Sequence, residues 1–306
     1  MDNATVSAVA VWLRETLGAR DAEVVGPVAG STTATGRVFR VRGVRGARGV
    51  ETAIPVLVKV YDRELPNVDG AHFALSEARG LTAAEQAGIA APRLVALDAD
   101  GSSIGIPAVA MTVLRGDVRA RPPGPVEEWV DGLATELVKI ARAPRPAVEL
   151  PLAESWREPA TADEPPDWID DVSVWRAAVE RVDAGLIGTT DGFIHRDYHP
   201  LNVLWHDDVV SGVLDWANAC EGPIEYDLSR CRVNVALAVD LDAADAFVAS
   251  CGELGDGYEG AWDLETVFSF VGDVDVLLAG NAFGAALTPG SIRATLAAVL
   301  AAAVRE

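Results

Sequence analysis

Alternating apolar and polar residues mark the first part of the chain and predict strands there. Residues 37–42 alternate, residues 53–61 form a β-branched run, and residues 107–114 form another apolar run. Between the last two runs, residues 71–88 have a helical pattern that ends at a glycine. The pattern predicts a small sheet with one helix.

The pattern becomes helical after a segment rich in proline and glycine, residues 115–125. One apolar stripe runs through residues 126–142, and further helical patterns cover residues 227–239, 243–251, 262–287 and 291–304. Only the regions 192–205 and 209–216 are typical of short strands. We therefore expect an N-terminal lobe of residues 1–115 and a larger, mainly helical lobe of residues 116–306.

Charge is distributed unevenly between these two parts. Residues 1–116 contain 12 basic and 12 acidic residues, whereas the remainder contains 13 and 34, which accounts for the net charge of −21. Nucleic acid and anionic membranes need a basic face, so we expect neither as a partner. The acidic excess is either a solvated surface or a means of attracting a cationic substrate.

The remaining composition is typical of a soluble cytoplasmic protein. Asp2 stands where a secretory signal would carry positive charge, and the longest apolar run, residues 294–304, falls short of the roughly 20 residues that span a bilayer. Three cysteines without metal-ligand spacing indicate neither disulfides nor a zinc site. We see no sign of a protein partner.

The stretch HRDYHPLNVLW, residues 195–205, carries the strongest chemical signal. Asp197 precedes Asn202 by five residues in a strand–loop–strand context, and Asp215 ends the next strand. Phosphoryl transfer needs a carboxylate that orients the attacking hydroxyl and oxygen ligands that hold Mg²⁺. The spacing matches the kinase catalytic loop and its later metal-binding aspartate. A turn with a chance Asp and Asn is the alternative.

A lysine and a glutamate upstream form a candidate ion pair. Lys59 is one of only two lysines in the chain, and strand alternation places it on one face with Leu57 and Tyr61. On the following helix, Glu77 falls on an apolar stripe, where an unpaired carboxylate would be costly. Taken alone, Lys59 could be a snorkelling lysine and Glu77 a partly exposed glutamate. Together they predict an ion pair that reaches nucleotide phosphates.

Other polar residues leave two interpretations open. Residues 28–41 are rich in glycine and hydroxyls, so Ser31 and Thr32 either fold over phosphates or belong to an ordinary hairpin turn. His195 supports the loop or transfers a proton, and His199 supports the loop or contacts phosphates. Asp227 caps a helix, braces the loop or binds substrate.

Together these motifs resemble the aminoglycoside phosphotransferase family, which includes choline kinase-like enzymes. The hallmark H-G-D-x-H-x-x-N, then D-W, G-P and D-L, corresponds here to HRDYHPLN, LDW and EGPIEYDL. The resemblance implies an α+β, bilobal, protein-kinase-like fold with a small N-terminal antiparallel sheet and one helix. Arg196 departs from the family's usual glycine, and no long activation segment follows Asp215, which argues against a protein kinase.

The resemblance also implies a role for each motif residue. Asp197 would be the catalytic base, Asn202 and Asp215 the Mg²⁺ ligands, and Lys59, supported by Glu77, the phosphate anchor. Adenine would meet the backbone near Thr112 and Leu114. The co-substrate would be ATP or GTP, and the acceptor a small, cationic molecule, with an aminoglycoside preferred. A macrolide, a metabolic alcohol such as choline, homoserine or a sugar, and a catalytically inactive nucleotide-binding module are the alternatives.

Overall fold

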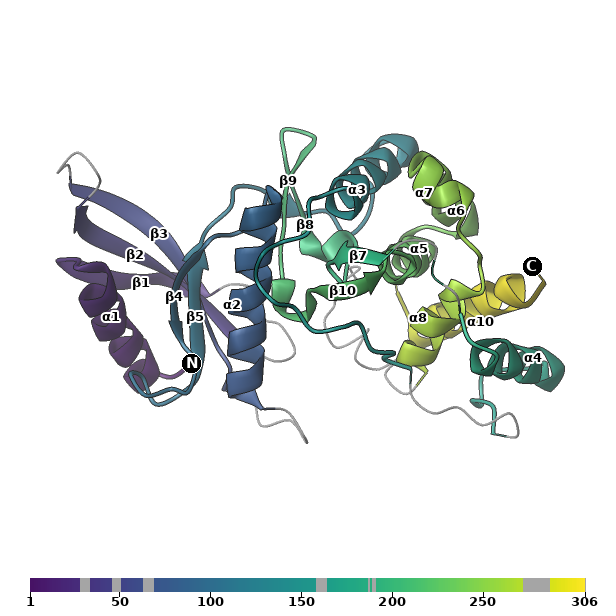
Figure 1. Cartoon of the computed structure of the whole chain (residues 1–306), viewed down its shortest axis with the longest axis horizontal. Coiled ribbons are helices and arrows are strands. Elements are labelled where there is room, and N and C mark those ends of the chain that lie inside the picture. The colour runs from purple at the N-terminus through teal and green to yellow at the C-terminus, as the bar shows by residue number, and fades with distance from the viewer. Residues whose placement is uncertain are drawn as a thin grey trace. The chain divides into compact units, whose positions relative to one another are not determined.

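The computed structural model describes residues 1–27, 34–45, 51–62, 69–157, 164–186, 188, 191–271 and 287–305 (Figure 1). The chain divides into two compact units. The first unit comprises Met1–Leu114, Ala147–Glu149 and Asp215–Asn218. The second comprises Arg115–Pro146, Leu150–Leu214 and Ala219–Glu306. Asp215, although late in the sequence, therefore belongs to the first unit.

A five-stranded antiparallel sheet forms the centre of the first unit. Its strand order is β1-β2-β3-β5-β4, with bounds β1 (Asp21–Pro27), β2 (Thr35–Arg45), β3 (Glu51–Val60), β5 (Ala108–Thr112) and β4 (Leu94–Asp98). In β3, Val56, Val58 and Val60 are fully buried in the core on one face. Alternation puts Lys59 on the other face.

Two helices accompany this sheet, one more than the sequence pattern predicted. Helix α2 (Gly70–Ala87) matches the expected helix and ends at Gly88, whose φ is 75°. The additional helix, α1 (Asn3–Leu17), begins at Asp2, which accepts a hydrogen bond from the Thr5 N–H. Its buried residues Val9, Trp12 and Leu13 belong to the same core as the valines of β3, and α1 lies against β1 and β2 (Figure 1). The prediction missed α1 because its apolar stripe is short.

The second unit is mainly helical, as predicted. In the described part, the helices of this unit have the bounds α3 (Val126–Ala141), α4 (Val172–Asp183), α5 (Glu225–Ala238), α6 (Leu241–Ser250), α7 (Glu253–Asp256), α8 (Trp262–Phe270) and α10 (Pro289–Arg305). Helix α5 is buried along most of its length and packs against α6, α8 and α10 (Figure 1). The sequence pattern did not predict α4. The expected helix over residues 262–287 is observed as α8, and residues 272–286 lie outside the described part.

Short strands in the second unit position the loop that contains Asp197. Strand β7 (Asp191–Ile194) pairs with β10 (Cys220–Pro223), and β8 (Val203–His206) lies between β6 (Asp117–Val118) and β9 (Val209–Val213). The predicted strand region 192–205 is therefore two strands, with a loop and a short 3₁₀ helix, Pro200–Asn202, between them. None of the helices in the described ranges is long and apolar enough to cross a membrane.

Candidate active site

Lys59 is the centre of an ion-pair cluster in the first unit. Its Nζ donates to Glu77 Oε2 at 2.7 Å and to Asp215 Oδ1 at 2.8 Å. Tyr61 Oη also donates to Glu77 Oε2, at 2.8 Å. Strand alternation puts Lys59 and Tyr61 on the same side, and α2 presents Glu77 to them. The Lys59–Glu77 pair predicted from the sequence therefore forms, and Asp215 joins it.

Burial and charge act on this cluster in opposite directions. Burial lowers the pKa of the Lys59 ammonium, but Asp215 and then Glu77 raise it more, so the pKa lies above its ordinary value. Burial raises the pKa of the Glu77 carboxyl, and the nearby ammonium opposes that shift. Lys59 therefore remains cationic at neutral pH, and one ammonium faces two carboxyl groups.

Asp215 reaches Lys59 because the backbone turns sharply after β9. Its φ is 62°, in the left-handed region that residues other than glycine adopt at a cost. The next residue, Trp216, is fully buried against α2 at Gly80. A Cβ on Gly80 would lie 2.0 Å from the Trp216 carbonyl oxygen, so only glycine fits there. This close approach holds the Asp215 segment against α2.

Asp197 lies in the second unit, in the loop after β7. Its Oδ1 accepts a hydrogen bond from Arg230 Nε at 2.8 Å, and His199 Nε2 lies 3.6 Å from the same oxygen. Among the described residues, Oδ2 has no hydrogen-bond partner, and the side chain is 18% exposed. Burial raises the pKa of the Asp197 carboxyl, but Arg230 and then His199 lower it more, so it lies well below its ordinary value.

Buried side chains hold the Asp197 loop in shape. Asp227 is fully buried and accepts the backbone N–H groups of His195, at 2.7 Å, and Tyr198, at 3.3 Å. His195 Nδ1 accepts the Asp197 N–H at 3.3 Å, which leaves Nε2 as the donor to the Leu214 carbonyl at 2.8 Å. Asp227 lies in the first turn of α5, whose N-cap residue is Ile224. The supporting interpretations of His195 and Asp227 therefore agree with the geometry.

Asn202 follows the loop at the end of the 3₁₀ helix and is 8% exposed. Its Nδ2 donates to the Asp197 carbonyl at 2.9 Å and lies 3.2 Å from His199 Nε2. In that orientation Oδ1 has no partner among the residues that the structure describes. An amide oxygen and a carboxylate such as Asp215 are the oxygen ligands that Mg²⁺ takes beside phosphates, so these residues fit that ion. The described ranges contain no cluster of three His, Cys, Asp or Glu suited to a metal.

Arg196, where the family usually has glycine, adopts a φ of 70°. That left-handed conformation explains a preference for glycine. Its guanidinium lies between two aromatic rings, 4.1 Å from the Trp156 centroid and 3.9 Å from that of Tyr226. Arg196 Nη2 also donates to the Glu154 carbonyl at 2.7 Å, and Glu265 lies 3.7 Å away. These contacts offset the backbone strain and the burial of the charge.

Thr112 and Leu114, the residues predicted to lie near the nucleotide base, have no hydrogen bond to the Lys59 cluster among the described residues. Thr112 pairs with Val56 on β3, and its Oγ1 accepts the Arg93 N–H at 2.9 Å. Leu114 follows β5 and is half-buried. Ser31 and Thr32 lie outside the described residues.

Arg230 is the residue that sequence reasoning missed. It lies on α5, 33 positions after Asp197, and no motif indicated it. The available signal was a pair of arginines, Arg230 and Arg232, in a helix that is otherwise mostly apolar beyond its first turn. A buried cation in such a helix needs a partner, and Asp197 is the partner of Arg230.

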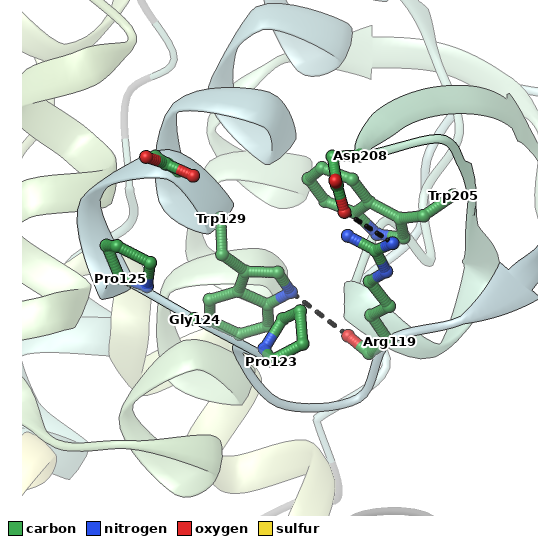
Figure 2. Close-up of a pocket in the computed structure, with 8 residues that line it drawn as sticks. Arg119, Pro123, Gly124, Pro125, Trp129, Trp205 and Asp208 are labelled. Atoms are coloured by element: carbon green, nitrogen blue, oxygen red, sulfur yellow. Dashed lines mark hydrogen bonds and ion pairs between the residues drawn. The ribbon is translucent and has the colours of Figure 1, made fainter.

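A separate cavity of about 230 Å³ in the second unit contains none of the predicted residues (Figure 2). Arg119 lines it, pairs with Asp208 at 2.8 Å and stacks on Trp205 at 5.5 Å. Trp129 Nε1 donates to the Arg119 carbonyl at 3.0 Å. The cavity is smaller than the roughly 300–1,000 Å³ of ligand pockets, and its arginine is already paired.

Comparison with known proteins gives one family and several similar structures. Residues 33–262 match the model of the phosphotransferase enzyme family. A thermostable mutant of aminoglycoside phosphotransferase APH(4)-Ia, in complex with ADP and hygromycin B, is similar at a TM-score of 0.58 and 14% identity, covering 96% of this chain and 98% of that one. A search of curated proteins found no match.

Two further structures show the same similarity. The GDP complex of aminoglycoside 2'-phosphotransferase-IIIa matches at a TM-score of 0.57 and 15% identity, over 98% of this chain and 99% of that one. Macrolide 2'-phosphotransferase MphH from Brachybacterium faecium matches at a TM-score of 0.54 and 16% identity. The match covers 96% of this chain and 97% of that one. These findings confirm the family resemblance and the fold class that the sequence predicted.

Proposed function

Because the chain belongs to the phosphotransferase enzyme family, we propose that it transfers the γ-phosphoryl group of ATP or GTP, with Mg²⁺, to a hydroxyl of a small molecule. The observation that carries this proposal is the contact of Lys59 with both Glu77 and Asp215. Three motif residues, separated by up to 156 positions, meet in one partly buried cluster.

In this proposal the first unit binds the nucleotide. Lys59 exchanges its Asp215 contact for phosphate oxygens, and Glu77 keeps the ammonium in place. Asn202 Oδ1 and Asp215 would hold Mg²⁺, which neutralises charge on the phosphates when it is bound. The backbone near Thr112 and Leu114 would receive the base, and Ser31 and Thr32 would lie over the phosphates.

The second unit orients the acceptor in this proposal. A hydroxyl donates to Asp197 Oδ2, the oxygen that no described residue engages. Its oxygen forms a bond to the γ-phosphorus while the bond from that phosphorus to the β,γ-bridging oxygen breaks and releases ADP or GDP, and the hydroxyl proton passes to Asp197. The lowered pKa of Asp197 makes the carboxylate a weak base. A weak base is sufficient because the transition state is loose and the proton leaves late, so orientation matters more than basicity.

For the acceptor we propose an antibiotic, with an aminoglycoside first, because similar structures carry such drugs and the second part of the chain is strongly acidic. A macrolide, or a metabolic alcohol such as choline, homoserine or a sugar, would use the same residues. We propose a cytoplasmic location, where nucleoside triphosphates occur and where the buried thiols of Cys220, Cys231 and Cys251 would remain reduced.

The test is Mg²⁺-dependent consumption of ATP and GTP with a panel of aminoglycosides, macrolides and metabolic alcohols. Asp197→Ala serves as the blank. Turnover with one class identifies the acceptor, and product analysis locates the phosphate. If no acceptor stimulates turnover above the blank, the proposed transfer to an alcohol is wrong.

A further inference from the structure

Asp197 is not the only charged group at the acceptor side of the second unit. Arg230 Nε lies 2.8 Å from Asp197 Oδ1, and its side chain is only 15% exposed. Arg230 also donates from Nη1 to Ser269 Oγ at 3.3 Å. The guanidinium is therefore held on two sides, and one oxygen of the carboxylate is held with it. The other oxygen, Oδ2, stays available.

The aromatic rings beside Asp197 already hold the protein's own cations. Arg230 lies 4.4 Å from the Phe270 centroid and 5.5 Å from that of Trp156. Trp156 and Tyr226 enclose Arg196. Aromatic faces are the usual binding sites for ammonium ligands, and each of these three rings already has a guanidinium group over it. An ammonium group bound to the same ring would lie close to that guanidinium.

The local charge near Asp197 differs from the charge of the second part of the chain as a whole. Arg230 pairs with the Asp197 carboxylate, and Glu265 lies 3.7 Å from Arg196. The buried Asp227 carboxyl is engaged by the backbone N–H groups of His195 and Tyr198 in the same loop. A hydroxyl that donates to Oδ2 at ordinary hydrogen-bond length lies within about 6 Å of the Arg230 guanidinium. An ammonium beside that hydroxyl would meet a like charge at short range in a weakly screened setting.

We infer that Arg230 is a positioning and selectivity residue: it fixes Asp197 with Oδ2 toward the acceptor, and it selects acceptors whose reacting hydroxyl has no ammonium group beside it. This inference rests on the proposed function. It is compatible with a polycationic drug only where the reacting hydroxyl is remote from the amines, and it disfavours choline.

Matched acceptors separate charge from shape. Two pairs of probes are used: 3,3-dimethylbutan-1-ol with choline, and glucose with glucosamine. Each pair has a neutral and an ammonium member of similar shape. Hygromycin B, gentamicin and erythromycin are tested separately as drug acceptors. For the wild type we expect kcat/KM to favour the neutral member by roughly ten-fold or more. A preference for the ammonium member would overturn the inference without any variant.

Substitutions then assign the preference to Arg230. In Arg230→Gln the ratio within each pair should fall toward one, with kcat reduced at least ten-fold and the KM for nucleotide unchanged. Arg230→Lys should retain the ratio and recover part of kcat. Arg181→Gln, which removes an exposed arginine paired with Glu259, is the matched control and should behave as the wild type.

The two ideas fail in different ways. The selectivity role is refuted if Arg230→Gln turns over the paired alcohols with the same ratio of kcat/KM, neutral to ammonium, as the wild type. That result leaves the kinase assignment intact. Absence of turnover with every alcohol and drug in the panel would refute the proposed function itself. If Arg230→Gln does not fold, as judged by circular dichroism, Arg230→Met, which keeps most of the side-chain length without the charge, replaces it in the same comparison of ratios.

Discussion

Each unit contains a cluster of opposite charges, and the two clusters are built differently. In the first unit, one ammonium, Lys59, contacts the carboxyl groups of both Glu77 and Asp215. In the second unit, one carboxylate, Asp197, is matched by one guanidinium, Arg230. A divalent ion and its phosphates suit the first arrangement, because carboxyl groups outnumber cations there. A neutral hydroxyl suits the second, where charge is cancelled but one carboxylate oxygen is open.

The largest effect should come from removing the carboxylate of the Asp197–Arg230 pair. Asp197→Ala should lower kcat by at least about 1,000-fold, because the acceptor loses both its orienting group and its proton acceptor. Nucleotide affinity, measured by isothermal titration, should change little. Asp183→Ala, which removes an exposed carboxylate paired with Arg157, is the control. Unchanged turnover in Asp197→Ala would remove it from the chemistry.

Removing the second carboxyl group of the Lys59 cluster should weaken metal-dependent binding. For Asp215→Ala we expect roughly 100-fold weaker nucleotide binding in the presence of Mg²⁺, because an outer-shell or direct ligand is lost. In EDTA this loss of affinity should disappear, because no metal ion is then left for Asp215 to hold. An equal loss with and without Mg²⁺ would contradict the metal role.

The support of Asp215 can be tested without touching any charge. Gly80→Ala would place a Cβ 2.0 Å from the Trp216 carbonyl, so the free energy of unfolding should fall by about 1–3 kcal/mol. Nucleotide affinity with Mg²⁺ should fall as well, because the Asp215 segment shifts. Gly124→Ala, in open space, is the matched control. Chemical denaturation and titration measure the two effects.

The smallest effect is expected at the edge of the Lys59 cluster. Tyr61→Phe removes one hydrogen bond to Glu77 Oε2 and keeps the ring, which should cost about 0.5–1.5 kcal/mol of stability. The KM for nucleotide should rise only a few-fold, since the Lys59–Glu77 contact remains. A loss as large as that of Asp215→Ala would mean that Tyr61 organises the cluster.

Sequence reasoning succeeded where the signal was local. Strand alternation located Lys59, helix spacing located Glu77, and the two form the expected ion pair. Each of these inferences used positions within one element. The change from alternating to helical patterns predicted a small sheet followed by a mainly helical part, and the family resemblance implied the kinase-like fold.

What the sequence could not supply depends on long-range packing. Nothing in the order of residues says that Arg230 on α5 meets Asp197, or that Lys59 meets Asp215 across 156 positions. Helix α1 was missed because Val9, Trp12 and Leu13 form a stripe too short to separate from a generic apolar stretch. Ser31 and Thr32 stay predictions.

The Arg196 side chain links three positions that can change only together. If Trp156 or Tyr226 were replaced alone, a buried guanidinium would remain on a backbone that favours glycine. If Arg196 returned to glycine alone, both rings would lose the group that they enclose. The effects of replacing Arg196, Trp156 and Tyr226 should therefore not add, and a double-mutant cycle between Arg196 and either ring should show a coupling free energy.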